Sequence, residues 1–529
     1  MGWKRSISGC VLGLAAAFAG LAAPMGQQVR TDKGIVEGST DGAVDRYLGI
    51  PYARPPVGRL RWREPLPAKP WVGVRRAKDF SAACYQTDGR PFGPFTREFV
   101  DLGRVSEDCL YLNVWEPRAH AKPLPVYFYI HGGGFGSGSG SIAVYDGGGL
   151  ARHGAVVVTI NYRLGAFGFL AHPALTAESP LKSSGNYGIL DAIAALKWVH
   201  ANIAHFGGDP ANVTIAGQSA GAAAVSDLLM SPLAKGLFQK ASIQSGPALG
   251  IRGRTLAQAE QTGLATARRL GAPTLATLRG LPAAAVLAAT VVEPPKDKPG
   301  GAPQIVMQPN VDGRVIAASP EQLETPFVSD VPIIAGYNRD EAFIFGTPKS
   351  TPASFASYVR DRYGDFADRF LDAYPHATEE EATRAMDDIG RDRYMAQLTI
   401  WADRRAASGR QPLYLYQFTH TYPSQDPARF GSFHTAEVPY VLGSVNIPGV
   451  KFTADDRQMA DQMEARWIAF MRSGNPDVRT MPHWPEWRAS PGRIMFLGLE
   501  PREDWSTSSA ARFKLFKEFV ASGGQLSLF

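Results

Sequence analysis

The stretch at 212–229 constrains the fold of this chain of 529 residues more than any other. A β-branched, apolar run ends at Gly217, a helix-forming run begins at Ala220, and Ser219 lies between them in the pattern Gly-x-Ser-x-Gly. Where a strand turns into a helix within three residues, the serine adopts a strained backbone conformation and its flanking neighbours must be small. The stretch therefore predicts a nucleophile elbow, with Ser219 at the carboxyl end of a strand and beside the amino end of a helix.

Length and composition are those of a globular protein. With 45% hydrophobic and 20% charged residues, the chain could form one large domain or two to three average ones. The formal net charge is +6, but no cluster of lysine and arginine is interleaved with aromatic residues, so no nucleic-acid partner is predicted. The histidines are scattered, and neither His-Glu-x-x-His nor a paired Cys-x-x-Cys occurs. We therefore predict no metal and no cofactor.

The amino terminus predicts export. Lys4 and Arg5 precede an apolar stretch at 11–23 that is rich in alanine, glycine and leucine and too short to span a bilayer well. We predict that residues 1–23, or up to 26, form a signal peptide that is removed. The mature chain, residues 24–529, would then be secreted or periplasmic and would carry no membrane anchor.

Export also explains the cysteines. Cys84 and Cys109 would be the two cysteines of the mature chain, and an even pair in an oxidising compartment is usually bridged. Closing a loop of that length would stabilise the fold by roughly 3 to 4 kcal/mol in the chain-entropy model. We expect a disulfide, with two buried free thiols as the alternative.

The order of predicted elements indicates an α/β fold. Short β-prone runs that alternate with turns at 29–65 predict antiparallel strands at one edge of a sheet. Nearly continuous apolar runs predict strands that are covered on both faces, and segments with helical spacing lie between and after them. The strands are expected at 126–130, 155–160, 213–216, 331–336, 413–418 and 493–497, and helices at 186–206 and 456–473. This alternation implies a mainly parallel sheet with helices on both faces.

Two further helical blocks interrupt this pattern, near 250–330 and 350–410. The strands before and after them fit one sheet, so we predict a single domain with helical insertions. We expect these insertions to cover the carboxyl edge of the sheet and to line the substrate pockets.

A serine hydroxyl is a poor nucleophile, so it needs a base and a third group that orients the base. In this fold the chain order is serine, acid, histidine. The predicted strand at 331–336 is followed at once by Asp340 and Glu341. Both qualify by position, and the pattern alone does not choose between them.

Four histidines follow the acid: His376, His420, His434 and His483. His376 falls in a polar helical block and His483 in a loop rich in proline and tryptophan, which makes both poor candidates. His420 ends a predicted strand, and His434 lies in the loop beyond it. The pattern gives His434 a small advantage.

Acyl transfer also needs hydrogen-bond donors for the oxyanion. Three consecutive glycines at 132–134 follow a predicted strand, and Ala220 begins the helix, so backbone N–H groups from both segments can point into one site. A phosphate loop is the alternative for the glycines. However, no Gly-Lys-Ser/Thr follows them and their spacing does not match the dinucleotide fingerprint. A plain flexible loop is the other alternative.

Five blocks resemble the type-B carboxylesterase/cholinesterase family. They are Glu-Asp-Cys-Leu-Tyr-Leu-Asn-Val-Trp at 107–115, His-Gly-Gly-Gly-Phe at 131–135, Asn-Tyr-Arg-Leu-Gly-Ala-Phe-Gly-Phe-Leu at 161–170, Gly-Gly-Asp-Pro at 207–210 and Gly-Gln-Ser-Ala-Gly at 217–221. The likeness runs from about residue 29 to the carboxyl end and is dense up to residue 246. The resemblance implies an α/β-hydrolase fold, a bridge between Cys84 and Cys109, and ester hydrolysis through an acyl-serine.

The resemblance also implies roles that the pattern leaves open. The run Gly-Tyr-Asn-Arg-Asp-Glu matches the acid block of the family, with Glu341 as the acid that supports Ser219. The run Phe-His-Thr-Ala-Glu-Val-Pro matches its histidine block, with His434 as the base. The oxyanion-hole positions of the family fall on Gly133, Gly134 and Ala220.

Two departures separate the chain from cholinesterases. Those enzymes carry a tryptophan in the cysteine-closed loop as a cation-π platform for choline, and none occurs between Cys84 and Cys109. They also have glutamate before the serine, where this chain has Gln218. The sequence thus resembles bacterial para-nitrobenzyl-esterase-like carboxylesterases and predicts a secreted serine carboxylesterase for a small-molecule ester. A lipase or acyltransferase of the same fold and a non-catalytic cholinesterase-like binding protein are the alternatives.

Overall fold

The computed structural model of the chain describes residues 25–246, 253–292, 304–305, 307–319, 326–343, 345–506 and 508–526. The predicted signal peptide lies outside these ranges, so it stays a prediction. Among the described residues, no helix is both long and apolar enough to span a bilayer.

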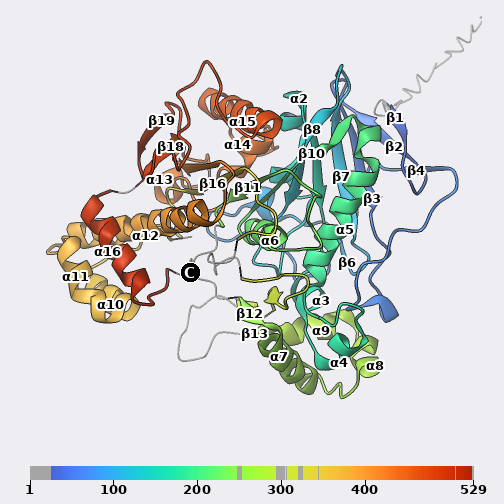
Figure 1. Ribbon diagram of the computed structural model, residues 1–529, viewed down its shortest axis with the longest axis horizontal. Coiled ribbons are helices and arrows are strands. Elements are labelled where there is room, and N and C mark those ends of the chain that lie inside the picture. Colours follow the sequence, from blue (N-terminus) through green and yellow to red (C-terminus); the bar gives the residue numbers. More distant parts are fainter. Residues whose placement is uncertain are drawn as a thin grey trace, which may run out of the picture.

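A mixed 13-stranded sheet forms the centre of the molecule (Figure 1). The strand order is β1-β2-β3-β7-β9-β8-β10-β11-β16-β17-β18-β19, with β4 beside β2. Pairing is parallel from β9 through β8, β10, β11, β16 and β17 to β18, and antiparallel from β1 to β9 and at β18–β19. This confirms the mainly parallel sheet with an antiparallel amino-terminal edge. The strands are β1 Met25–Arg30, β2 Ile35–Thr40, β3 Val44–Pro51, β4 Val74–Arg76, β7 Tyr111–Pro117, β8 Leu124–Ile130, β9 Val156–Ile160, β10 Gly208–Gln218, β11 Lys240–Gln244, β16 Ile333–Asn338, β17 Leu413–Phe418, β18 Arg493–Leu497 and β19 Arg502–Trp505.

Helices cover both faces of this sheet. Alternate residues of β8 point to opposite sides: Phe128 and Ile130 share a core cluster with residues of α5 and α6, whereas Tyr127 and Tyr129 share another with residues of α14 and α15. All four side chains are fully buried. Burial on both faces explains why the strand is a nearly continuous apolar run. The helices named here are α5 Tyr187–Asn202, α6 Ala220–Leu229, α14 Val438–Leu442 and α15 Ala454–Ser473.

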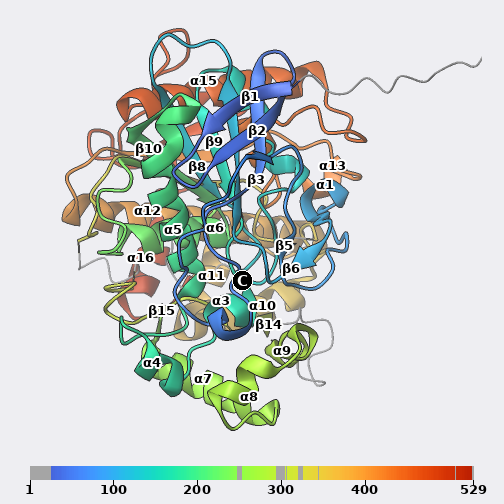
Figure 2. The same cartoon turned by 90° about the vertical axis from the view of Figure 1, so that its right-hand side faces the viewer.

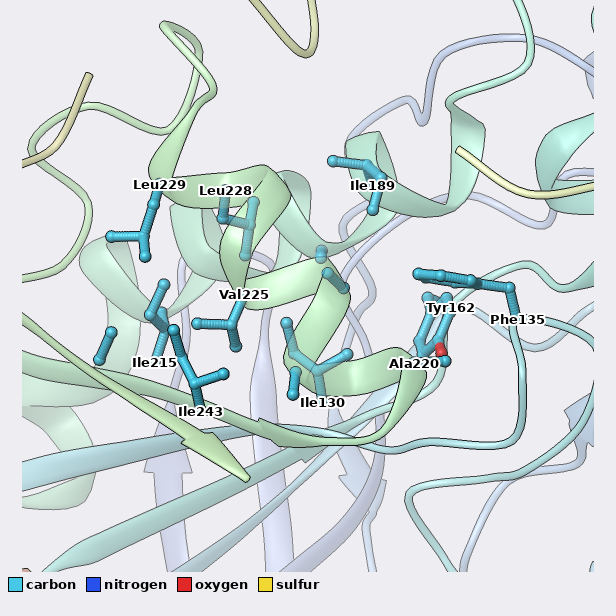
Figure 3. Packing of buried hydrophobic residues seen from close by; sticks show 14 of the residues in the cluster. Ile130, Phe135, Tyr162, Ile189, Ile215, Ala220, Val225, Leu228, Leu229 and Ile243 are labelled. Carbon is cyan, nitrogen blue, oxygen red and sulfur yellow. The ribbon is translucent and has the colours of Figure 1, made fainter. Parts of the chain in front are cut away.

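The close-up of the first cluster shows how α6 is anchored (Figure 3). Val225 and Leu228 of α6 face Ile215 of β10 and Ile243 of β11, and all four are completely buried. Burying a side chain of this size contributes about 1.5–3 kcal/mol. The carboxyl half of α6 is therefore anchored on β10 and β11.

Both predicted insertions contain helices in their described parts. The first holds α7 Leu256–Arg269, α8 Leu275–Gly280 and α9 Ala283–Thr290, and the second holds α10 Pro352–Tyr363, α11 Ala367–Ala373 and α12 Glu379–Ser408. Figures 1 and 2 both show α7, α8 and α9 together at the lower end of the molecule. The predicted loop at 294–303 lies outside the described residues.

Several elements were not predicted. The strand β11 contains a lysine, a serine and a glutamine, yet it is buried between β10 and β16. Most of the other missed strands and α-helices are short: β4, β5 Ala83–Cys84, β6 Val105–Ser106, β19, α1 Arg97–Val100, α2 Gly148–Arg152, α3 Gly165–Phe169, α4 Pro173–Glu178, α13 Pro427–Phe430, α14 and the two-residue strands β12 Arg254–Thr255, β13 Val291–Val292, β14 Gln304–Ile305 and β15 Asn310–Val311. The longer helix α16 Ala510–Ala521, which buries Leu515, Phe516 and Phe519, was also missed.

Candidate active site

Ser219 occupies a strained turn between β10 and α6. Its φ of 58° and ψ of −124° lie in a region that residues with a side chain rarely adopt, at a cost of about 1–3 kcal/mol. Gly217 and Gly221 allow the turn, because a Cβ on Gly217 would lie 2.4 Å from the Gly221 carbonyl and one on Gly221 would lie 2.0 Å from the Ile130 carbonyl oxygen. The sharp turn that the sequence predicted is therefore present.

The glycine loop at 132–134 lies against this turn. A Cβ on Gly132 would lie 3.1 Å from the Ser219 Cβ, so the two segments are in direct contact. Gly133 and Gly134 have φ values of +103° and +63°, which favour glycine. The Gly133 carbonyl accepts hydrogen bonds from the N–H groups of Gly136 and Ser137, at 3.0 Å each. The loop is thus held in a tight turn beside the amino end of α6.

Of the four downstream histidines, only His434 lines the same cavity as Ser219. The Nε2 atom of His420 lies 2.8 Å from the Asp456 carboxylate. His376 contacts the Tyr374 carbonyl at 2.8 Å, and His483 contacts Asp477 at 2.8 Å on the surface. Each of these three histidines has its own local partner away from Ser219.

The two neighbouring carboxylates have different surroundings. Glu341 is 2% exposed, and its Oε2 lies 3.1 Å from His434 Nδ1. Asp340 instead contacts Arg339 at 2.9 Å and Arg391 at 2.7 Å, and accepts a hydrogen bond from the Ser432 N–H at 2.9 Å. Glu341 is thus the carboxylate of this pair that contacts a histidine.

Glu341 is oriented by two further donors. The Asn338 N–H donates to its Oε1 at 2.6 Å, and the Ser245 hydroxyl donates to the same oxygen. Hydrogen bonds of this kind stabilise an ionised carboxylate. Burial would lower the pKa of His434, but the hydrogen bond and the charge of Glu341, with the charge of Glu437, raise it above its ordinary value.

Glu437 is a buried carboxyl that sequence reasoning missed. It is fully buried, and burial together with the charge of Glu341 raises its pKa to about 7. Asn338 Nδ2 donates a hydrogen bond to it. The signal that could have revealed it is a charged residue inside the otherwise apolar run that follows His434.

The cavity that contains Ser219 and His434 has a volume of about 1040 Å³. Just over half of its described lining residues lie between 85 and 105, inside the loop closed by the Cys84–Cys109 disulfide. The remainder of the described lining comes from the glycine loop with residues near it, from the elbow and from residues 434–435. The described parts of the helical insertions contribute none of this lining, and the disulfide-closed loop forms the wall on this side. That the insertions line the substrate pockets stays a prediction.

The structure also brings together a group with metal-ligand chemistry that the scattered histidines did not predict. Ligand atoms of His153, Asp461 and Glu464 lie within 4.8 Å of one another. These residues follow α2 or lie on α15, and none lines the cavity of Ser219. His153 and Glu464 lie 3.7 Å apart, as a weak ion pair. The expected absence of a metal stays a prediction, and no step of the chemistry is assigned to this group.

The mainly parallel sheet, the serine at the strained turn and the acid–histidine pair after later strands define the α/β-hydrolase class. Within that class, the chain belongs to the carboxylesterase family, whose model matches residues 25–515. Membership in this family makes it a carboxylic ester hydrolase.

Relatives with named activities cover most of the chain. It is 38% identical to fumonisin B1 esterase of Sphingopyxis macrogoltabida, over 88% of this chain and 86% of that protein. It is 35% identical to para-nitrobenzyl esterase of Bacillus subtilis, over 93% and 98%. It is 32% identical to phenmedipham hydrolase of Pseudarthrobacter oxydans, over 89% and 95%.

Proposed function

We propose that the protein hydrolyses carboxylic esters through an acyl-enzyme on Ser219. The Ser219 Oγ attacks the ester carbonyl carbon while His434 takes the hydroxyl proton, which gives a tetrahedral oxyanion. The C–O bond to the alcohol then breaks, and His434 gives its proton to the departing oxygen. Water repeats the sequence on the acyl-serine, which releases the acid and returns the proton to Ser219.

Glu341 and the backbone donors have supporting roles in this proposal. Glu341 holds the His434 tautomer that has its proton on Nδ1, and it stabilises the imidazolium that forms. The N–H groups of Gly133, Gly134 and Ala220 stabilise the oxyanion, at roughly 3–4 kcal/mol for each donor in the transition state. The observation that carries the proposal is the 3.1 Å contact between His434 Nδ1 and buried Glu341, in the cavity of a serine with positive φ.

The first experiment measures hydrolysis of para-nitrophenyl esters by the protein and by Ser219→Ala. We expect the variant to lose activity by about 10⁴- to 10⁶-fold. Thr87→Ala is the matched control, because Thr87 lines the same cavity and belongs to neither the proton-transfer pair nor the proposed oxyanion hole. An organophosphonate should label the protein on the peptide that contains Ser219. Full activity of Ser219→Ala would refute the mechanism.

We further propose that the chain is exported. The charged and apolar amino terminus predicts a signal peptide, and the Cys84–Cys109 disulfide supports an oxidising compartment. Fractionation of producing cells, with mass determination of the amino terminus, tests this. A full-length amino terminus in the cytosolic fraction would contradict it.

A further inference from the structure

A row of phenylalanine rings leads from the rim of the cavity to the loop that carries His434. We call Phe345, Phe92, Phe95, Phe99 and Phe433 the phenylalanine strip. We propose that the strip binds an extended apolar chain of the ester, so that the preferred substrates are neutral esters with a long alkyl or acyl group. This inference rests on the proposed function and names the substrate class of that site.

The rings of the strip are in contact in sequence. Ring centroids are separated by 6.5 Å between Phe345 and Phe92 and by 5.0 Å between Phe92 and Phe95. Phe95 and Phe99 each contact Phe433 edge-to-face at 5.6 Å. Phe433 directly precedes His434. Phe345, Phe92, Phe95 and Phe99 therefore form a continuous row of rings, and buried Phe433 packs behind this row and joins it to the loop of His434.

Exposure falls steadily along this path. Phe345 is 58% exposed and Phe92 is 51% exposed, whereas Phe99 is 7% exposed and Phe433 is 1% exposed. These two contacting rings form an exposed apolar patch, and an apolar ligand that covers it removes this surface from water. Phe92, Phe95 and Phe99 all line the cavity of Ser219, so a ligand that covers the rim would reach into the site.

The charges that line the cavity favour a neutral ligand there, and at the outer end of the strip Arg429 Nε donates to the Phe345 carbonyl at 2.9 Å. Among the described residues that line the cavity, Asp88 and Arg90 carry full charges of opposite sign, and no lysine or glutamate is present. Neither a cationic nor an anionic substrate would thus find an excess of opposite charge on this wall. The rings of the strip pack largely edge-to-face against one another, which favours apolar contact with a chain over a cation-π platform.

The cavity is large enough for such a chain. Its volume of about 1040 Å³ lies at the upper end of the range of about 300–1,000 Å³ that is common for small-molecule sites. Each methylene that moves from water onto the strip would raise kcat/KM by up to about fourfold. The effect should end where the chain passes Phe345 and re-enters water.

The test compares para-nitrophenyl acetate, butyrate, octanoate and laurate below their aggregation concentrations. We expect kcat/KM to rise with chain length in the wild-type protein. In the double variant Phe92→Ser/Phe345→Ser, we expect this rise to flatten for the two longer esters when each rate is divided by the acetate rate of the same variant. Trp505→Ser is the matched control, because Trp505 is 60% exposed and does not line the cavity.

A binding measurement separates this inference from the proposed function. Ser219→Ala should bind para-nitrophenyl laurate more tightly than the butyrate ester, and adding Phe92→Ser/Phe345→Ser should remove most of the difference. Equal affinity for both esters, or a preference that survives the double variant, would overturn the inference. Failure to hydrolyse any ester, with laurate still bound through the strip, would instead refute the proposed function alone.

Discussion

The side-chain amide of Gln218 lies beside the His434 ring, with its Nε2 atom 3.2 Å from Nε2 and 3.4 Å from Nδ1. Gln218 is 1% exposed and directly precedes Ser219. The residue before the nucleophile therefore contacts the base, so a charge placed at this position would act on the base at short range. A neutral amide at this position leaves Glu341 and Glu437 as the carboxyl groups that raise the pKa of His434.

Gln218→Glu should move the pH profile of kcat/KM to higher pH. A base must be deprotonated to act, so activity rises as pH passes through the pKa of His434 in the free enzyme. A third carboxylate favours the imidazolium and raises that pKa further, which shifts the midpoint upward by about one pH unit. Gln218→Met, which has similar length and no charge, is the control. An unchanged midpoint in Gln218→Glu would contradict the geometry.

Glu341→Gln and Asp340→Asn form a matched pair that separates catalysis from stability. Glu341→Gln should lower kcat by about 10⁴-fold, because the amide no longer favours the productive tautomer and charge of His434. Asp340→Asn should leave kcat within a few-fold but lower the free energy of unfolding by about 1–3 kcal/mol, since it loses its partners Arg339 and Arg391. Kinetics and guanidinium titrations of both variants check this. A large loss of kcat in Asp340→Asn would reverse the assignment.

Glu437→Gln should change the pH dependence of stability. Burial raises the pKa of Glu437 from its ordinary value of 4.5 to about 7, so the folded protein binds more protons than the unfolded chain between these pH values. The full contribution of this group to the free energy of unfolding is present below pH 4.5. That contribution decreases by on the order of 3 kcal/mol as the pH rises through 7. The difference in free energy of unfolding between the variant and the wild type should therefore shift in favour of the variant when the pH is raised from 5 to 8.

Unfolding midpoints at pH 5 and pH 8 measure this effect. Glu379→Gln, on the exposed first turn of α12, is the control and should not alter the difference between the two midpoints. If Glu437→Gln also leaves that difference unchanged, the buried carboxyl does not titrate as proposed.

Sequence patterns predicted those parts of the fold that depend on local sterics or strong apolar runs. The elbow was predictable because a turn of this sharpness at Ser219 requires Gly217 and Gly221, whatever the rest of the chain does. The strands β8 and β9 and the buried segment 213–216 of β10 were predictable because burial on both faces favours nearly continuous apolar runs. The polar first half of β10, 208–212, was not predicted.

What the patterns missed depends on long-range contacts. β11 has polar residues because its lysine lies at a strand end, where Lys240 Nζ donates to Asn212 Oδ1 at 2.6 Å, and because Gln244 lies near Glu437. Asp340 and Glu341 are equivalent by position, and only the packing of the chain 93 residues later brings His434 to one of them. The cavity wall could not be assigned because no local pattern shows which loop covers the site.

Removing the disulfide should weaken both the fold and the cavity wall. Cys84 and Cys109 are 25 residues apart and buried at 2% and 1% exposure. The double variant Cys84→Ser/Cys109→Ser should lose about 3–4 kcal/mol of unfolding free energy, and KM should rise because the loop they close lines the cavity. Reductant should destabilise the wild type but not the double variant. Equal stability of both proteins would contradict this prediction.

Gln86 links this loop to the glycine loop. Its Oε1 accepts the Gly138 N–H and its Nε2 donates to the Gly138 carbonyl, both at 2.7 Å, and its Nε2 also donates to the Cys84 carbonyl at 2.9 Å. Gly138 follows Gly133 and Gly134 on the same loop, so the amide fixes the position of the proposed oxyanion donors. We infer that Gln86 is a positioning residue.

Gln86→Met keeps the length of the side chain and removes all three hydrogen bonds. The half-buried backbone groups of Gly138 would lose their partner, at a stability cost of about 1 kcal/mol. We expect kcat to fall about tenfold with KM nearly unchanged, because misplaced donors weaken the transition state more than the bound ester. Gln425→Met, which removes a surface bond to the Gly93 carbonyl, is the control. A lower unfolding midpoint with an unchanged kcat would limit Gln86 to a structural role.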